Sequence, residues 1–184
     1  MTTAVLVVDL QVEVLARCWE ADAVVTRNAV LVQRARAVDV PVIWVQHEEP
    51  GMERDTDGWQ LAPALVPWPG ETRIYKSYRD AFTEPELPAT LERFGVTHLV
   101  VTGAQSDYCV RTAAQTAASH GYSVTLVSDA HTTEDSQWDD VTISARQIVA
   151  HTNRYFSGLR YPGATFSVVP HYAVRFARRT RSTS

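Results

Sequence analysis

The chain of 184 residues is 45% hydrophobic and 21% charged, with a formal net charge of −4 and a pI of about 5.8. This length and composition fit one globular domain with a sizeable core and exclude a disordered or fibrous protein. The acidic balance argues against nucleic acid as the main partner.

The sequence shows no targeting signal and no disulfide pattern. The apolar run near the amino terminus stops at Asp9 and has no basic region before it, which predicts neither a signal peptide nor an anchor. No other stretch approaches the ~20 apolar residues that cross a bilayer. The two cysteines, Cys18 and Cys109, form neither a framework of bridges nor a CxxC motif. We expect a cytoplasmic protein with no membrane partner.

Short valine-rich runs alternate with helical patterns along the chain. The apolar runs predict six strands, at 4–8, 42–45, 72–75, 99–102, 123–127 and 165–169. Helices are predicted from Asp22 to before Pro41, over 85–94, from about 106 to 120 and over 136–150, with a short one after the last strand. This alternation predicts a single-domain α/β protein, doubly wound around a six-stranded, mostly parallel sheet. The domain is expected to span residues 1–184, with a flexible basic tail over about 175–184.

The segment 48–70 has a different character, because it is rich in glycine and proline and holds Trp59 and Trp68. A loop of this length inside a compact domain is often functional. We interpret it as an ordered wall around a pocket, with plain surface packing as the alternative.

The segment 99–121 carries the strongest chemical signal. A buried strand meets a tight turn at Gly103, and a helix with small apolar residues on one face follows. Ser106 or Asp107 can cap that helix, which places Cys109 in its first turn. Since the positive end of a helix lowers the pKa of a thiol, we predict a nucleophilic Cys109. The alternative is a small buried hydrophobic residue, as most free cysteines are.

Two further polar side chains follow predicted strands. Asp9 ends the strand at 4–8, and Lys76 ends the strand at 72–75. The carboxyl ends of parallel strands gather at one edge, where open sheets bind their ligands. Asp9, Lys76 and Cys109 can therefore meet there, although a turn role is the alternative for Asp9.

Three motifs carry a family resemblance: VVDLQ around Asp9, YKSYRDAF around Lys76, and GAQSDYCV at the start of the Cys109 helix. Together they resemble the isochorismatase-like cysteine hydrolases over nearly the whole chain. The resemblance implies the isochorismatase-like hydrolase fold and a catalytic triad of Asp9, Lys76 and Cys109. It also implies a non-proline cis peptide at Ala104–Gln105, with the N–H groups of Gln105 and Cys109 forming an oxyanion hole.

The implied activity is hydrolysis of the C–N bond of a small amide, lactam or carbamoyl compound through a thioester intermediate. Asp9 would act as base and acid, Lys76 would stabilise the anions, and the oxyanion hole would stabilise the developing charge. One alternative is hydrolysis of a vinyl ether such as isochorismate, for which the cysteine is dispensable. The other is a non-catalytic scaffold with the same fold. Family members commonly form homodimers or homotetramers, so we expect one of these states.

The histidines are scattered, with no HxH or HExxH spacing. His47 lacks the Asp-x-His neighbourhood of the metal-binding nicotinamidases, so we expect no metal and a structural His47. His131 and His151 are the alternatives to Asp9 as a base, in a Cys–His dyad. No GxGxxG or GxxxxGK[ST] motif indicates a nucleotide, and we expect no cofactor.

The pocket walls are assigned from segments that should lie near the strand ends. The substrate-binding candidates are Gln11, Trp59, Tyr78, Phe82 and Tyr108, with the core or a subunit interface as the alternative place for each. The substrate is expected to be a small molecule whose identity depends on these walls. Cys18 is expected to be a packed residue.

Overall fold

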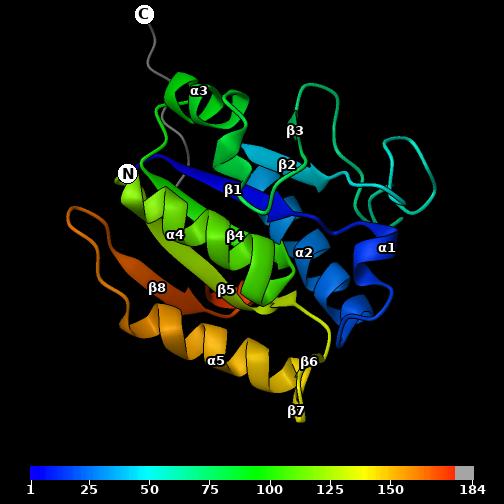
Figure 1. The fold of residues 1–184 in the computed structure, drawn as a ribbon. Helices are drawn as coiled ribbons and strands as arrows, with labels where there is room; N and C mark the ends of the chain where they lie inside the picture. Colours follow the sequence, from blue (N-terminus) through cyan, green and yellow to red (C-terminus); the bar gives the residue numbers. More distant parts are fainter. Residues whose placement is uncertain (177–184) are drawn as a thin grey trace, which may run out of the picture.

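A computed structural model describes residues 1–176 (Figure 1), and the basic tail expected over 175–184 lies mostly outside this range. Six strands form one sheet in the order β3-β2-β1-β4-β5-β8, and every neighbouring pair is parallel. The strands are β1 (Thr3–Val8), β2 (Val42–His47), β3 (Thr72–Lys76), β4 (His98–Ala104), β5 (Ser123–Thr132) and β8 (Phe166–Val169). The predicted α/β fold with its parallel six-stranded sheet is therefore confirmed.

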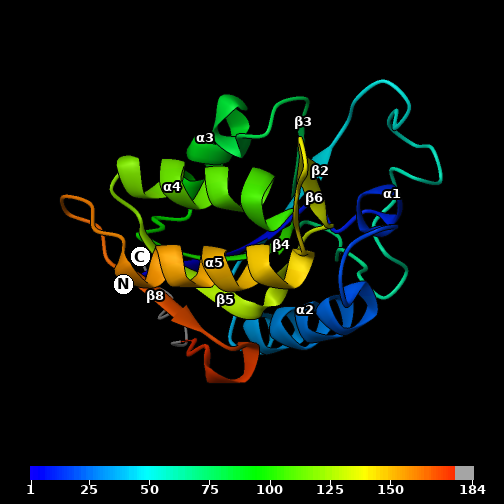
Figure 2. The same cartoon turned by 60° about the horizontal axis from the view of Figure 1, so that its bottom comes forward.

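Helices cover both faces of the sheet (Figures 1 and 2). One face packs against α2 (Ala21–Arg36), and the other packs against α3 (Glu86–Arg93), α4 (Arg111–Ser119) and α5 (Ala145–Gly158). A hydrophobic core lies on each face of the sheet, and alternate residues of β1 point into one or the other. Leu6 packs in the core under α4, and Val7 packs in the core under α2. A strand covered on both sides needs apolar residues at every position, which explains the run AVLVV.

The strand order reverses between β1 and β4. After β1 the chain builds β2 and β3 on one side, and it then forms β4 on the other side of β1. The two strands stay in register to their carboxyl ends, where Val8 lies opposite Gly103. Gly103 has a φ of +124°, and a Cβ there would lie 2.0 Å from the carbonyl oxygen of Val8, so only glycine fits. Such a reversal opens a crevice at the strand ends, where open sheets bind their ligands.

The helix predicted over 136–150 is wrong in its first half. Residues 136–143 form a hairpin of β6 (Ser136–Trp138) and β7 (Val141–Ile143), which projects beyond the end of α5 (Figure 1). Asp139 turns the hairpin with a φ of 55°. Ser144 and Gln147 then form a capping box that starts α5, so the helix begins later than its apolar pattern suggests.

The fifth strand is longer than predicted and contains a bulge. It continues to Thr132 instead of ending at Val127. Val101 pairs with Leu126, but Gly103, two residues later, pairs with His131, so the intervening residues of β5 bulge out of the ladder. The bulge brings the end of β5 beside the segment that follows β4.

Four short elements complete the described chain: α1 (Val12–Leu15), the 3₁₀ turns η1 (Ala81–Thr83) and η3 (His171–Ala173), and the π-helical turn η2 (Ser106–Val110). The loop over 48–70 holds no helix or strand. Trp59 is buried in the loop and packs near Tyr75, whereas Trp68 is half exposed and lies against Arg36.

Candidate active site

The carboxyl end of β1 delivers Asp9 to the crevice. Its φ of 47° turns the chain sharply after Val8, and its N–H donates to the carbonyl of Val45 at 2.9 Å. Aspartate adopts this left-handed conformation more readily than most residues. Only 2% of the side chain is exposed, so its charge needs a partner.

The carboxyl end of β3 supplies that partner. Nζ of Lys76 lies 2.7 Å from Oδ2 of Asp9, and the lysine side chain has no exposed surface. The same Nζ donates to Sγ of Cys109 at 3.3 Å and lies 3.3 Å from Nδ1 of His47. Burial acts to lower the pKa of Lys76, but the charges of Asp9 and Cys109 outweigh it, and the pKa is raised. The ammonium therefore stays charged at the centre of three polar groups.

Cys109 lies in η2, directly after a cis peptide bond between Ala104 and Gln105. The expected side-chain cap of this turn is wrong. The Oγ of Ser106 bonds to Nδ1 of His131, and Asp107 accepts from the hydroxyl of Thr133, so both side chains reach toward the end of β5. Cross-links to the neighbouring strand hold the turn in place of a cap.

The pKa of Cys109 also differs from the prediction. Burial and the carboxylate of Asp9 raise the pKa of Cys109 to about 12, and Lys76 lowers it by a smaller amount. The prediction of a lowered pKa considered the helix end alone, whose effect is worth only about 0.3–1 kcal/mol at an exposed site. The raised pKa favours the protonated thiol at neutral pH, and the carboxylate of Asp9 is one of the groups that raise it.

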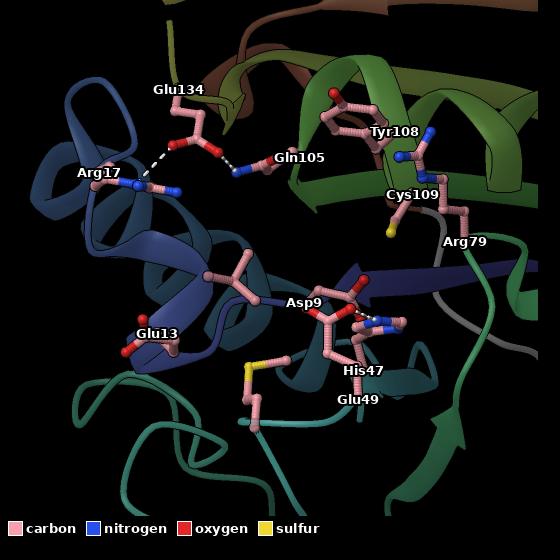
Figure 3. A pocket seen from close by; sticks show the side chains of 12 residues that line it. Asp9, Glu13, Arg17, His47, Glu49, Arg79, Gln105, Tyr108, Cys109 and Glu134 are labelled. Carbon is pink, nitrogen blue, oxygen red and sulfur yellow. Dashed lines mark hydrogen bonds and ion pairs between the residues drawn. The ribbon is translucent and has the colours of Figure 1, made fainter. Parts of the chain in front are cut away.

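A cavity of about 380 Å³ opens onto these groups (Figure 3). Most of its wall is polar or charged, and the wall residues are Asp9, Glu13, Val14, Arg17, His47, Glu49, Met52, Arg79, Gln105, Tyr108, Cys109 and Glu134. Lys76 is not part of the wall and contacts Asp9 and Cys109, which are. A wall of this kind suits a polar ligand.

Two charged groups lie on opposite sides of the cavity in Figure 3. On one side, Arg17 pairs with Glu134 at 2.8 Å, and Gln105 donates to the same carboxylate at 3.4 Å. On the side of Cys109, the guanidinium of Arg79 lies 3.9 Å from the centre of the Tyr108 ring. Arg79 has no ion-pair partner within residues 1–176, so its charge is available to a ligand.

Comparisons with known proteins agree with this architecture. The isochorismatase domain model matches residues 3–153. The chain is similar to streptothricin hydrolase of Streptomyces noursei, with 38% identity over 139 residues that cover 72% of this chain and 55% of the relative. Maleamate amidohydrolase of Pseudomonas putida is 30% identical over 131 residues, covering 63% of this chain and 60% of the relative. The crystal structure of an isochorismatase from Pseudomonas putida KT2440 superposes with a TM-score of 0.87 and 29% identity, over 94% of this chain and 90% of that one.

The chain belongs to the isochorismatase family. The family resemblance inferred from the motifs is therefore confirmed, and so is the isochorismatase-like fold. The chain spans about half the length of the streptothricin hydrolases it matches, 55% and 50% of the two relatives.

The expected pocket residues divide into two groups in this isochorismatase-family chain. Tyr108 lies on the cavity wall, whereas Gln11, Trp59, Tyr78 and Phe82 do not. Gln11 is fully buried, and its amide bonds to the backbone of His47 and Trp59, where it fixes the loop to β2. Tyr78 is 69% exposed, and Phe82 stacks on His120 away from the cavity.

Several wall residues were missed by sequence reasoning. Glu13, Val14 and Arg17 come from α1 and the segment after it, and Glu134 follows β5. These segments have no motif, so no local signal could have identified them. Arg79 lies inside the YKSYRDAF motif, which does provide such a signal.

The two histidines considered as alternative bases do not line the cavity. His131 is buried between Ser106 and Asn153, and His151 is exposed on α5. His47 does lie on the wall, with Nε2 3.4 Å from the carboxylate of Glu49. Within residues 1–176, no three His, Cys, Asp or Glu side chains gather as a set of metal ligands. Over the same range, no helix has the length and apolar character needed to cross a membrane.

Proposed function

We propose that this chain is a cysteine-dependent hydrolase that cleaves the C–N bond of a small amide, lactam or carbamoyl compound through a thioester. One observation carries the proposal: Nζ of Lys76 joins Oδ2 of Asp9, at 2.7 Å, and Sγ of Cys109, at 3.3 Å, beside a polar cavity. A nucleophile, a base and a fixed cation are the groups that nucleophilic acyl transfer requires.

The first step begins from the protonated thiol. Because the pKa of Cys109 is raised to about 12, little thiolate exists at neutral pH. Asp9 takes the thiol proton as Sγ bonds to the carbonyl carbon, so the sulfur becomes anionic only while it attacks. Lys76 remains an ammonium throughout and stabilises the charge on both neighbours.

The carbonyl oxygen becomes an oxyanion in this step. By the family resemblance, the N–H groups of Gln105 and Cys109 would donate to it. Loss of one such donor typically costs about 3–4 kcal/mol of transition-state stabilisation. Gln105 and Cys109 both lie on the cavity wall, which supports this assignment.

The carboxylic acid of Asp9 then returns its proton to the leaving nitrogen, and the C–N bond breaks to leave a thioester on Cys109. In the second half, Asp9 takes a proton from water while the water oxygen attacks the thioester carbon. Collapse of that intermediate releases the carboxylic acid and returns the proton to sulfur. One carboxylate thus serves both halves of the reaction.

The relatives support amide chemistry. A maleamate amidohydrolase and two ureidoacrylate amidohydrolases are among them, and their names describe cleavage of C–N bonds. The vinyl ether reaction needs an acid but no sulfur nucleophile. The observed contact between Lys76 and Cys109 therefore favours the amide reaction over the vinyl ether reaction.

The test compares Cys109→Ala with Cys18→Ala. Cys18 donates to the carbonyl of Val14 and is not on the cavity wall, so its removal controls for loss of a thiol. Cleavage of the C–N bond is measured as ammonia release from small primary amides and ureido compounds and as the new amine of ring-opened lactams, and hydroxylamine traps the acyl group as a hydroxamate. We expect Cys109→Ala to abolish both signals and Cys18→Ala to retain both.

Three results would contradict the proposal. Ammonia release that survives in Cys109→Ala would exclude a thioester. Turnover of isochorismate that needs Asp9 but not Cys109 would establish the vinyl ether reaction instead. A folded protein that turns over no compound of either kind, and whose Cys109 alkylates with an ordinary thiol pKa, would indicate a scaffold.

A further inference from the structure

A buried chain of hydrogen bonds lies behind the nucleophile turn. Oγ of Ser106 is 2.7 Å from Nδ1 of His131, and Nε2 of His131 is 3.1 Å from Oδ1 of Asn153. Ser106 and His131 are 0% and 1% exposed. None of the three residues lines the cavity, so none of them is placed to touch a substrate.

The partners determine the protonation state of His131. The amide nitrogen of Asn153 donates to the carbonyl of Ser128 at 2.9 Å, which turns its oxygen toward the imidazole. Nε2 must therefore carry the hydrogen that this oxygen accepts. Burial lowers the pKa of His131, against smaller opposing effects of Asn153 and Asp129, and the ring is neutral. Nδ1 is then free of hydrogen and accepts from the Ser106 hydroxyl.

The backbone between Ser106 and Cys109 links this series of hydrogen bonds to the nucleophile. Ser106 is the first residue of η2, and Cys109 is three positions later in the same turn. No side chain caps the turn, so the bonds to the end of β5 hold it. The bulge in β5 is what brings His131 opposite Gly103 and within reach of Ser106.

We propose that His131, as the neutral Nε2–H tautomer, is a positioning residue that fixes the turn Ser106–Val110 through Ser106 and so holds Sγ of Cys109 against Lys76. The inference rests on the proposed function only in taking Cys109 as the nucleophile. It assigns a role to a buried histidine that the reaction steps do not use.

Two substitutions of His131 test the hydrogen bonds of Nδ1 and Nε2 separately. In His131→Asn, the short amide can replace Nδ1 and still accept from Ser106. In His131→Gln, the longer amide can replace Nε2 and donate to Asn153, but it leaves the Ser106 hydroxyl without its acceptor. A purely structural role predicts similar losses in melting temperature and no change at Cys109 in either variant.

The readout is the rate at which iodoacetamide alkylates Cys109, measured from pH 7 to 10.5 in a Cys18→Ala background. This rate needs no substrate, so the outcome is independent of whether amide hydrolysis is the reaction. We expect His131→Asn to retain the pH profile of the parent chain. In His131→Gln the loosened turn exposes the thiol, its pKa falls from about 12 toward the ordinary 9.0, and alkylation at pH 9 rises at least tenfold.

The matched control is His98, whose ring nitrogens also both have hydrogen-bond partners, here the hydroxyls of Thr3 and Thr125. Burial lowers the pKa of His98 as well. His98 begins β4, so His98→Gln disturbs the sheet at the end remote from Cys109 and should not change the profile. If His131→Gln fails to fold, Ser106→Ala removes the same bond from the other side and should give the same tenfold rise. A folded His131→Gln or Ser106→Ala protein with the parent profile would overturn the proposal.

Discussion

Replacing Lys76 with methionine removes the cation from the buried pair while it keeps the length of the side chain. The pair has a separation of 2.7 Å, with 0% and 2% of the Lys76 and Asp9 side chains exposed. The other carboxylate oxygen, Oδ1, has no hydrogen-bond partner within residues 1–176. Lys76→Met therefore leaves a buried carboxylate without its counter-ion.

The magnitude follows from that burial. Removal of one partner from a buried pair costs about 3–5 kcal/mol, a large share of the roughly 5–15 kcal/mol that stabilises a domain. With a urea m-value of about 2 kcal/mol/M, the unfolding midpoint should fall by about 1.5–2.5 M. The double variant Asp9→Asn/Lys76→Met removes the unpaired charge and should recover more than half of that loss.

The assay is urea unfolding followed by far-UV circular dichroism. Arg17→Gln is the control, because it breaks a pair of similar length, 2.8 Å, whose arginine side chain is 81% exposed. An exposed pair contributes about 0–1 kcal/mol, so the control should shift the midpoint little. The reasoning would be refuted by a Lys76→Met midpoint as close to the parent as that of Arg17→Gln, or by a double variant no more stable than the single one.

Asp9→Asn should abolish amide turnover yet accelerate alkylation of Cys109 at pH 9, because the carboxylate raises the pKa of that thiol; equal alkylation rates would contradict this. The pKa of Cys109 is about 12 in the folded protein and about 9.0 in the unfolded chain, so the unfolded state loses this proton first as the pH rises. The free energy of unfolding should therefore fall between these two pH values, and the urea midpoint of Cys109→Ala should fall less steeply over that range than the midpoint of the parent chain. Arg79→Gln should lower the ratio of iodoacetate to iodoacetamide rates at Cys109 several-fold, because the unpaired guanidinium attracts the anionic reagent to the cavity; an unchanged ratio would exclude that role. Gly103→Ala should cost more than about 3 kcal/mol in the same unfolding assay, since its Cβ would lie 2.0 Å from the carbonyl oxygen of Val8, and a cost below about 1 kcal/mol would contradict the close approach of β1 and β4.

Much of the fold could be predicted from the sequence because its signals are local. Continuous apolar runs such as AVLVV belong to strands covered on both faces, and their order with the helices determines a parallel sheet. The placement of Asp9 and Lys76 at strand ends followed from the same runs. The hairpin over 136–143 was missed because a period of two over three residues is too short to distinguish from a helical pattern.

Only the tertiary structure decided the chemistry of the site. A pKa depends on burial and on charges that arrive from distant parts of the chain, which is why Cys109 has a raised pKa instead of the lowered one predicted from its own helix. The cavity wall could not be predicted from local patterns either, because Glu13, Arg17 and Glu134 come from segments without a motif. The sequence by itself determined the six strands of the main sheet, their order along the chain, and the places of Asp9 and Lys76 at strand ends. The bulge that carries His131 to Ser106, and the burial that joins Lys76 to its neighbours, exist only in the packed chain, because they are set by contacts between residues far apart in the sequence.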